Sequence, residues 1–202
     1  MQPKSILKKY WGWEKFRPGQ EDAVLSGMAG RDTLVILPTG GGKSLCYQLL
    51  GICQESLTLV ISPLVALMMD QVKSLQNKGI RAMSISGDLK EQELVTALDR
   101  CQYGNLQFLY VSPERLQHPL VRERLQNLTV GLVVVDEAHC ISQWGHDFRP
   151  AYRKIHEIFP LVNHPIVMAV TATATPKVKE DIIASLQLRN PKVIQTTSIL
   201  LQ

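Results

Sequence analysis

The sequence lacks the features that mark membrane-embedded, secreted and zinc-bound proteins. It contains no stretch of about 18 uncharged apolar residues, the length that a membrane-spanning helix requires. Residues 1–10 include basic side chains but no apolar run as long as that of a signal peptide. The four cysteines form no C-x-x-C pair, and their spacing suits neither a zinc site nor a disulfide framework. We therefore expect reduced thiols, a cytoplasmic location and no membrane span.

Strong charge and repeated sequence are also missing. The formal net charge is +4, which permits a polyanionic partner but does not require one. We find no internal repeat and no low-complexity segment. The chain has 202 residues, of which 45% are hydrophobic and 20% charged, so it is long enough for one domain with a sizeable core.

Apolar runs with the character of buried strands alternate along the chain with segments of helical period. Strands are expected at 33–37, 57–61, 82–86, 106–111, 130–135, 166–170 and 193–197. Helices are expected at 6–13, from 18 to about 27, and at 43–53, 64–77, 90–101, 150–159 and 177–186, with shorter helical pieces in 114–126. Because the strands are apolar throughout, the pattern predicts an α/β fold with a mostly parallel sheet covered by helices on both faces.

A glycine-rich loop with the sequence Pro-Thr-Gly-Gly-Gly-Lys-Ser follows the first expected strand. We call residues 38–44 the phosphate loop. Its glycines Gly40, Gly41 and Gly42 let backbone N–H groups turn towards an anion at a helix N-terminus. Thr39 belongs to the same expected binding site. Lys43 can place a charge on the β- and γ-phosphates, and the Ser44 hydroxyl can bind Mg²⁺. Leu37 stands where the common motif has its first glycine. A plain turn is the alternative, but the pattern favours a nucleotide site.

Two adjacent carboxylates, Asp136 and Glu137, follow the apolar strand at 130–135. An acidic residue at a strand end can hold the Mg²⁺ that bridges nucleotide phosphates, which we assign to Asp136. Glu137 can orient or deprotonate an attacking water. The alternative is an exposed acidic turn. The two carboxylates and Lys43 are therefore the candidate catalytic residues, with ATP and Mg²⁺ as the expected cofactors.

Several motifs together resemble superfamily 2 helicases: Phe-Arg-Pro-Gly-Gln at 16–20, the phosphate loop, Asp-Glu-Ala-His at 136–139 and Thr-Ala-Thr-Ala-Thr at 171–175. The run His-Cys-Ile-Ser-Gln-Trp-Gly-His-Asp-Phe-Arg-Pro at 139–150 narrows the resemblance to the RecQ family of ATP-dependent DNA helicases. The similarity extends from about residue 13 to 188 and corresponds to the first of the family's two RecA-like P-loop NTPase lobes.

The resemblance implies a role in nucleotide binding for three residues near the N-terminus. Gln20 would read the adenine edge, for which a carboxamide has both a donor and an acceptor. Arg17 would help to hold the nucleotide, and Trp13 stands where the family carries an aromatic side chain that stacks on adenine. Each could instead be an ordinary surface or packing residue.

The resemblance also implies DNA contacts and a coupling loop. Ser62, Ser112 and Arg115 lie in Ser-Pro segments that resemble backbone-contact segments, although serine also caps helices. The aromatic loop, residues 140–149, resembles the loop that couples DNA binding to ATP hydrolysis; a hydrophobic plug is the alternative. The coupling residues that we assign by this resemblance are His139, Trp144, His146, Phe148, Arg149, Thr171 and Thr173.

The resemblance implies a 3′–5′ DNA helicase that acts on single-stranded and partially duplex DNA in repair and recombination, near the nucleoid if bacterial. We expect N-terminal helices with the adenine motif at 1–30, the first lobe at 31–190 and the start of a junction at 191–202. The second lobe is missing, so we expect a fragment or truncated product with weak or no unwinding activity. An RNA-dependent ATPase of the DEAD-box type and a non-catalytic nucleotide- or DNA-binding module remain as alternatives.

Overall fold

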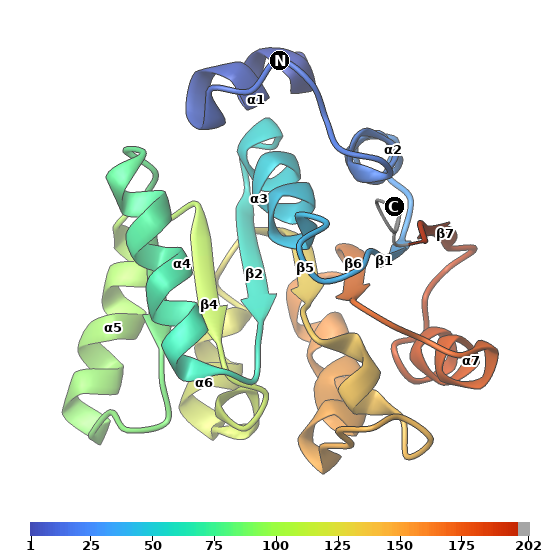
Figure 1. Ribbon diagram of the computed structural model, residues 1–202. Coiled ribbons are helices and arrows are strands. Elements are labelled where there is room, and N and C mark those ends of the chain that lie inside the picture. The colour runs from blue at the N-terminus through green and yellow to red at the C-terminus, as the bar shows by residue number, and fades with distance from the viewer. Residues whose placement is uncertain (198–202) are drawn as a thin grey trace.

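The computed structural model describes residues 1–197, in which seven strands form one sheet (Figure 1). The strands are β1 (Thr33–Ile36), β2 (Leu57–Ile61), β3 (Ala82–Ile85), β4 (Phe108–Val111), β5 (Val130–Val135), β6 (Ile166–Thr171) and β7 (Lys192–Gln195). Their spatial order is β3-β4-β2-β5-β6-β1-β7, and each described pairing is parallel. The predicted α/β fold with a parallel sheet is therefore confirmed.

Helices connect consecutive strands, as parallel pairing requires. The α-helices are α1 (Pro3–Trp11), α2 (Gln20–Met28), α3 (Lys43–Cys53), α4 (Val65–Asn77), α5 (Glu91–Tyr103), α6 (Pro119–Leu125) and α7 (Pro176–Ser185). Three 3₁₀-helices are η1 (Arg115–Gln117), η2 (Ala138–Ile141) and η3 (Pro150–Val162). The bounds of α3, β2 and β5 are those expected from the sequence, and the others differ by a few residues at their ends.

Alternating strand residues supply two cores, one on each face of the sheet. In β2, Leu59 and Ile61 pack against the face covered by α5, α6, η3 and α7, whereas Val60 packs against the face covered by α3 and α4. Ile6 and Leu7 of α1 join Leu49 of α3 in a third, smaller cluster at the outer side of that helix. The result is a three-layer arrangement with helices on both faces.

The segment that begins at Pro150 differs from the sequence-based prediction. An α-helix ending near residue 159 was expected, but the chain forms the 3₁₀-helix η3, which continues to Val162. Tyr152, Ile155 and Ile158 are all fully buried, and their spacing of three matches the three residues per turn of a 3₁₀-helix. The burial of this stripe therefore favours the tighter winding. Asn163, with φ of 60°, ends the helix.

The strand order places three chemically important chain segments side by side. β5, β6 and β1 are neighbours, so their carboxyl ends lie next to one another at one edge of the sheet. Asp136 follows β5, Thr171 ends β6, and the phosphate loop follows β1. In an open parallel sheet this edge is where ligands bind.

The C-terminal segment extends the same sheet. The expected junction at 191–202 includes β7, which pairs with β1, while residues 198–202 lie outside the described part of the chain. Within residues 1–197, no helix has both the length and the apolar character needed to cross a membrane.

Candidate nucleotide site

The phosphate loop is shaped by glycines with left-handed backbone conformations. Gly40 and Gly42 have φ values of 82° and 76°, a region that residues with a Cβ adopt at a cost. Helix α3 begins at Lys43 directly after Gly42, and no side chain caps its N-terminus. The N–H groups of its first turn therefore point out of the helix without an intrahelical partner, which suits a phosphate.

Two side chains of the Phe-Arg-Pro-Gly-Gln segment hold this loop. Gln20 is fully buried, and its Nε2 donates to the Gly42 carbonyl at 3.1 Å. Its Oε1 accepts a 2.8 Å hydrogen bond from the Arg17 backbone N–H. The Arg17 guanidinium donates to the Gly40 carbonyl. The carboxamide expected to read adenine is thus engaged with the phosphate loop, so any contact with adenine requires it to exchange partners.

Trp13 lies next to this group. Its side chain is 43% exposed, and the Arg17 Cζ atom is 5.5 Å from the centroid of its ring. The cation–π contact orients Arg17 between the indole and the loop. An exposed indole that is braced on one side by a guanidinium is a suitable platform for a planar base.

The two adjacent carboxylates occupy different environments. Burial, followed by the neighbouring Glu137 carboxylate, raises the pKa of Asp136 to about 6. The Glu137 backbone N–H, which donates to Asp136 Oδ1 at 2.9 Å, and the Lys43 ammonium act in the opposite direction on that pKa. Glu137 itself has a left-handed φ of 52°, which is uncommon for a residue with a side chain.

His139 connects the Glu137 carboxylate to the end of β6. Its Nδ1 lies 2.8 Å from the Thr171 hydroxyl and 3.4 Å from Glu137 Oε2. Because the Thr171 hydroxyl donates to the Thr173 carbonyl, it accepts from Nδ1–H. Burial lowers the pKa of His139, so the ring is neutral at pH 7. A hydrogen-bonded chain therefore joins Asp-Glu-Ala-His to the Thr-Ala-Thr segment.

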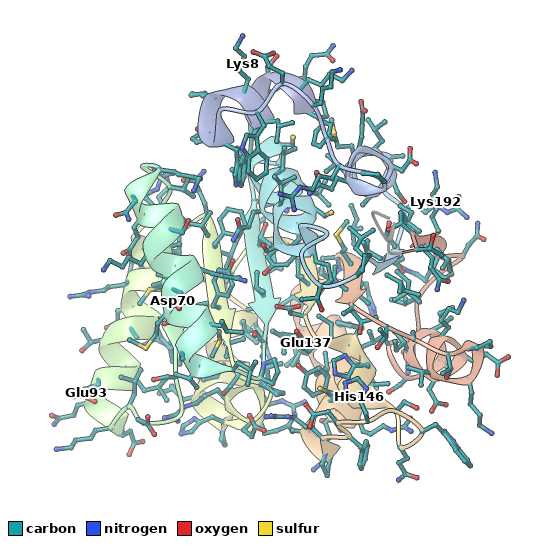
Figure 2. All side chains as sticks on the ribbon, in the orientation of Figure 1. Lys8, Asp70, Glu93, Glu137, His146 and Lys192 are labelled. Carbon is teal, nitrogen blue, oxygen red and sulfur yellow. The ribbon has the colours of Figure 1, made fainter. Side chains whose placement is uncertain are left out.

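A cleft of about 470 Å³ includes three of the expected nucleotide-site residues, Thr39, Lys43 and Glu137. It is lined by Thr39, Lys43, Pro63, Leu64, Glu137, His139, His146, Asp147, Ala172 and Thr173. Figure 2 shows Glu137 and His146 beyond the carboxyl ends of the strands, at the opposite end of the molecule from Lys8. The structure therefore places Lys43 and the Asp136-Glu137 pair at one site, although they lie far apart in the sequence.

The donor set formed by this cleft together with Ser44 and Asp136, the chain neighbours of its lining residues Lys43 and Glu137, fits a magnesium-bound phosphate chain. Ser44 lies in the first turn of α3 and provides a hydroxyl. Asp136 provides a carboxylate. Its pKa is raised although the Lys43 ammonium acts to lower it, so Lys43 only partly compensates the charge of this carboxylate. Hydroxyl and carboxylate oxygens are the ligands that Mg²⁺ prefers. The uncapped helix terminus supplies N–H donors for the phosphates beside them.

A second cleft, of about 570 Å³, lies beside the first. It includes Trp144, Thr175 and Val178 and reaches the ends of β1 and β7. The two clefts share His139, His146, Ala172 and Thr173. These four residues form a wall between the two clefts, with Thr39 and Lys43 in the first cleft and Trp144 of the aromatic loop in the second.

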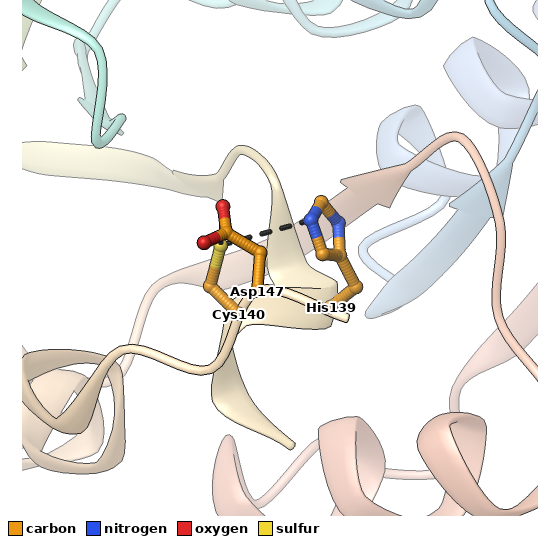
Figure 3. Close-up of side chains that lie close together, drawn as sticks. All are labelled: His139, Cys140 and Asp147. Carbon is orange, nitrogen blue, oxygen red and sulfur yellow. Dashed lines mark hydrogen bonds between the residues drawn. The ribbon is translucent and has the colours of Figure 1, made fainter. Parts of the chain in front are cut away.

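Cys140 and Asp147 of the aromatic loop lie beside the wall residue His139 (Figure 3). The Cys140 thiol donates to Asp147 Oδ2 at 3.8 Å and lies 3.7 Å from His139 Nε2. The rings of His139 and His146 stack with centroids 4.6 Å apart. Sequence reasoning treated Cys140 as a small apolar residue and assigned no role to Asp147. Their position beside Asp-Glu-Ala-His was the only available signal.

These side chains also form a donor set for a soft cation. Atoms of His139, Cys140 and Asp147 lie within 4.8 Å of one another. A cation would require the thiolate form of Cys140, but burial and then the Asp147 carboxylate raise the pKa of this thiol to about 12. The protonated thiol therefore acts as a hydrogen-bond donor that holds the aromatic loop.

Three other expected DNA-contact residues follow strands β2 and β4. Ser62 is buried. Ser112 Oγ accepts a hydrogen bond from the Arg115 backbone N–H at 3.3 Å, so Ser112 has the helix-capping role that was the alternative to a DNA contact. The Arg115 guanidinium donates to the carbonyls of residues 86, 87 and 89, each at 3.0 Å. In this structure Arg115 therefore fixes the loop between β3 and α5.

The remaining aromatic-loop residues differ in exposure. Trp144 is 67% exposed, whereas Phe148 and Arg149 are half-buried. The Arg149 backbone N–H donates to the Cys140 carbonyl at 2.8 Å, and its side chain lies 3.9 Å from Asp147. The end of the loop is thus tied to its own beginning, while Trp144 projects outwards.

The raised pKa of Asp136 predicts a measurable stability effect of Asp136→Asn in the metal-free chain. Ionisation of the buried carboxylate opposes folding, because its pKa rises from 3.8 to about 6 on folding. The wild-type free energy of unfolding should therefore fall between pH 4 and 6, by up to about 3 kcal/mol. The asparagine keeps the Oδ1 acceptor, so this variant should be more stable than wild type at pH 7 but not at pH 4.

Urea denaturation in EDTA at the two pH values measures this difference. Asp70→Asn, at an exposed position of α4, is the matched control and should show no comparable pH dependence. Equal stability of Asp136→Asn and wild type at pH 7 would contradict the proposed cost of ionising Asp136.

Comparisons with known proteins agree with this geometry. Residues 17–182 match the DEAD/DEAH box helicase family. The chain is 46% identical over 194 residues to ATP-dependent DNA helicase RecQ of Bacillus subtilis (strain 168), covering 95% of this chain and 33% of that protein. It is 45% identical over 185 residues to the probable ATP-dependent DNA helicase RecS of the same strain, covering 91% of this chain and 37% of that protein.

A solved structure shows the same fold at low sequence identity. The DUF1998 helicase MrfA bound to DNA superposes with a TM-score of 0.77 at 18% identity, over 96% of this chain and 29% of that chain. The present chain spans about a third of the length of its curated relatives. It has the RecA-like lobe architecture, and the family match includes the phosphate loop, Asp-Glu-Ala-His and the Thr-Ala-Thr segment. This chain therefore belongs to the DEAD/DEAH box helicase family.

Proposed function

We propose that this chain is the ATP-binding first lobe of a RecQ-type, ATP-dependent 3′–5′ DNA helicase that acts in repair and recombination. The observation that carries the proposal is the convergence of Lys43, Asp136 and Glu137 beyond the carboxyl ends of β1 and β5, the two strands that flank β6. A cation at a helix N-terminus beside two carboxylates is suited to phosphoryl transfer rather than to structural stabilisation.

The phosphate loop binds the triphosphate in this proposal. Backbone N–H groups of Gly40, Gly41 and Gly42, the first turn of α3 and Thr39 contact the phosphates, and Lys43 carries the balancing charge. Ser44 and Asp136 hold Mg²⁺, which when bound neutralises charge on the phosphate oxygens. Glu137 orients and deprotonates the attacking water.

The adenine end of the nucleotide lies against the Phe-Arg-Pro-Gly-Gln segment. Trp13 stacks on the base, and Arg17 holds the nucleotide near Gly40. Gln20 reads the adenine edge after its carboxamide leaves the loop carbonyls. Its present bonds to that loop support a link between occupancy of the base site and the shape of the phosphate site.

The wall between the two clefts supports coupling of ATP hydrolysis to DNA binding. The wall residue His139 links the Glu137 carboxylate through Thr171 to Thr173, and the His146 ring stacks on that of His139. Trp144, Phe148 and Arg149 then follow any movement of the aromatic loop. Ser62, Ser112 and Arg115 contribute to the DNA-backbone surface, Arg115 by holding the loop at 86–89.

The complete enzyme requires a second lobe. In our proposal residues 31–190 form the first lobe, the N-terminal 30 residues add the adenine motif, and residues from 191 lead to the second lobe. That lobe supplies arginines for the γ-phosphate. The substrate is single-stranded and partially duplex DNA, so the enzyme works where the DNA lies, at the nucleoid in a bacterium.

Nucleotide and polynucleotide binding by the 202-residue chain test this function. We expect magnesium-dependent ATP binding, stronger binding or ATPase stimulation by single-stranded DNA than by RNA of the same sequence, and little or no strand separation. Equal or greater stimulation by RNA would favour the DEAD-box alternative. Robust unwinding by this chain alone would refute the requirement for a second lobe.

A further inference from the structure

Helix α7 holds the aromatic loop through a partly buried hydrogen bond that Asp181 accepts. The hydroxyl of Ser142, a fully buried residue, donates to Asp181 Oδ2 at 2.5 Å. The same oxygen of Ser142 accepts a 3.2 Å hydrogen bond from the Trp144 backbone N–H. Asp181 therefore fixes the backbone on the N-terminal side of Trp144, although 39 positions separate it from Ser142.

A lysine of the same helix covers one face of the exposed indole. Lys177 Nζ lies 4.1 Å from the centroid of the Trp144 ring. Lys177 and Asp181 are four residues apart on α7 and therefore lie on one face of the helix, next to the aromatic loop. One face of the indole is thus occupied by an ammonium, and the ring remains 67% exposed.

The position of α7 connects this pair to the proposed site of chemistry. The helix begins at Pro176, and Thr175 caps it by accepting a hydrogen bond from the Val178 N–H at 3.3 Å. Thr175 and Val178 line the same cleft as Trp144, which also includes His139 and Thr173 of the shared wall. The N-terminal end of α7, the shared wall and Trp144 therefore border one cleft.

We propose that Lys177 and Trp144 form one composite contact for single-stranded DNA, in which the ammonium meets a backbone phosphate and the open indole face stacks a base. Asp181 is a positioning residue, which acts through Ser142 to keep the ring beside Lys177. The inference rests on the proposed function, because it assigns residues to the DNA surface of that helicase lobe. Base–aromatic stacking beside a cationic group is the usual composition of such a surface.

Binding of a fluorescently labelled oligothymidylate to the 202-residue chain, followed by anisotropy over a range of salt concentrations, tests the contact. Lys177→Ala should weaken binding about three- to tenfold and reduce the salt slope by about 0.7, the value for one phosphate contact on a single strand. Trp144→Ala should weaken binding about five- to twentyfold with an unchanged slope. The double variant should lose less than the product of the two effects, since the groups act together.

Lys179→Ala is the matched control. Lys179 lies on the same helix but donates to Gln195, away from the indole, so its replacement should change the affinity less than twofold. Asp181→Ala should weaken binding without changing the salt slope, and Asp181→Asn should restore it because an amide oxygen can still accept from Ser142. Urea denaturation checks that each variant is folded.

The outcomes separate this inference from the proposed function. If wild type binds the oligothymidylate but Lys177→Ala behaves like Lys179→Ala, the composite contact is wrong and the helicase proposal stands. The composite contact is equally wrong if the effects of Lys177→Ala and Trp144→Ala are fully independent. If wild type shows no binding to single-stranded DNA, both proposals are overturned.

Discussion

Replacement of Asp32 by alanine is expected to destabilise the chain by about 3–4 kcal/mol, because two backbone N–H groups, one buried and one partly buried, lose their acceptor. Asp32 is 3% exposed and lies just before β1. Its Oδ1 accepts from the Val167 backbone N–H at 2.9 Å, and its Oδ2 accepts from the Arg189 backbone N–H at 2.7 Å. One side chain thus ties the start of β6 and the segment before β7 to the strand that leads to the phosphate loop.

The urea concentration at half-unfolding, together with an unchanged m-value, measures this loss. Asp32→Asn keeps one carbonyl acceptor and should cost roughly half as much. Asp88→Ala removes an exposed aspartate and should change stability by no more than about 0.5 kcal/mol. A loss below about 1 kcal/mol for Asp32→Ala would mean that water satisfies both N–H groups.

The parallel sheet and the phosphate loop could be predicted because their signals are local. β2 and β5 are continuous apolar runs, and Pro38 with three glycines ends the run that forms β1. The same signals place Asp136 and Lys43 after strands, and a parallel sheet brings strand ends to one edge. A shared edge therefore follows from the topology alone, whereas the proximity of Asp136 to Lys43 depends on the strand order, in which only β6 separates β5 from β1.

The remaining features depend on contacts between distant parts of the chain. The engagement of Gln20 with the phosphate loop joins residues 22 positions apart, and Asp181 meets Ser142 from a different helix. The winding of η3 depends on which residues the sheet buries, and periodicity over so short a segment did not distinguish it from an α-helix. Arg115 could not be assigned to a loop at 86–89 from its own sequence neighbours.

Glu137→Gln is expected to separate nucleotide binding from hydrolysis. The carboxylate lies in the phosphate cleft, 3.4 Å from His139 Nδ1, and the neutral amide that replaces it cannot accept a proton from water. Loss of a general base lowers the rate about 100-fold or more. The affinity for magnesium–ATP should stay within about twofold, because the binding charges on Lys43 and Asp136 are unchanged.

Lys43→Ala is the contrasting variant, since it removes a charge that contacts the phosphates themselves. It should weaken ATP binding about tenfold or more, the usual effect of losing a charge-assisted hydrogen bond, and abolish hydrolysis as a consequence. Titration with a fluorescent ATP analogue and phosphate release with single-stranded DNA measure the two properties. A wild-type rate equal to that of Lys43→Ala would indicate a non-catalytic module. A Glu137→Gln rate equal to that of wild type would place water activation on another residue.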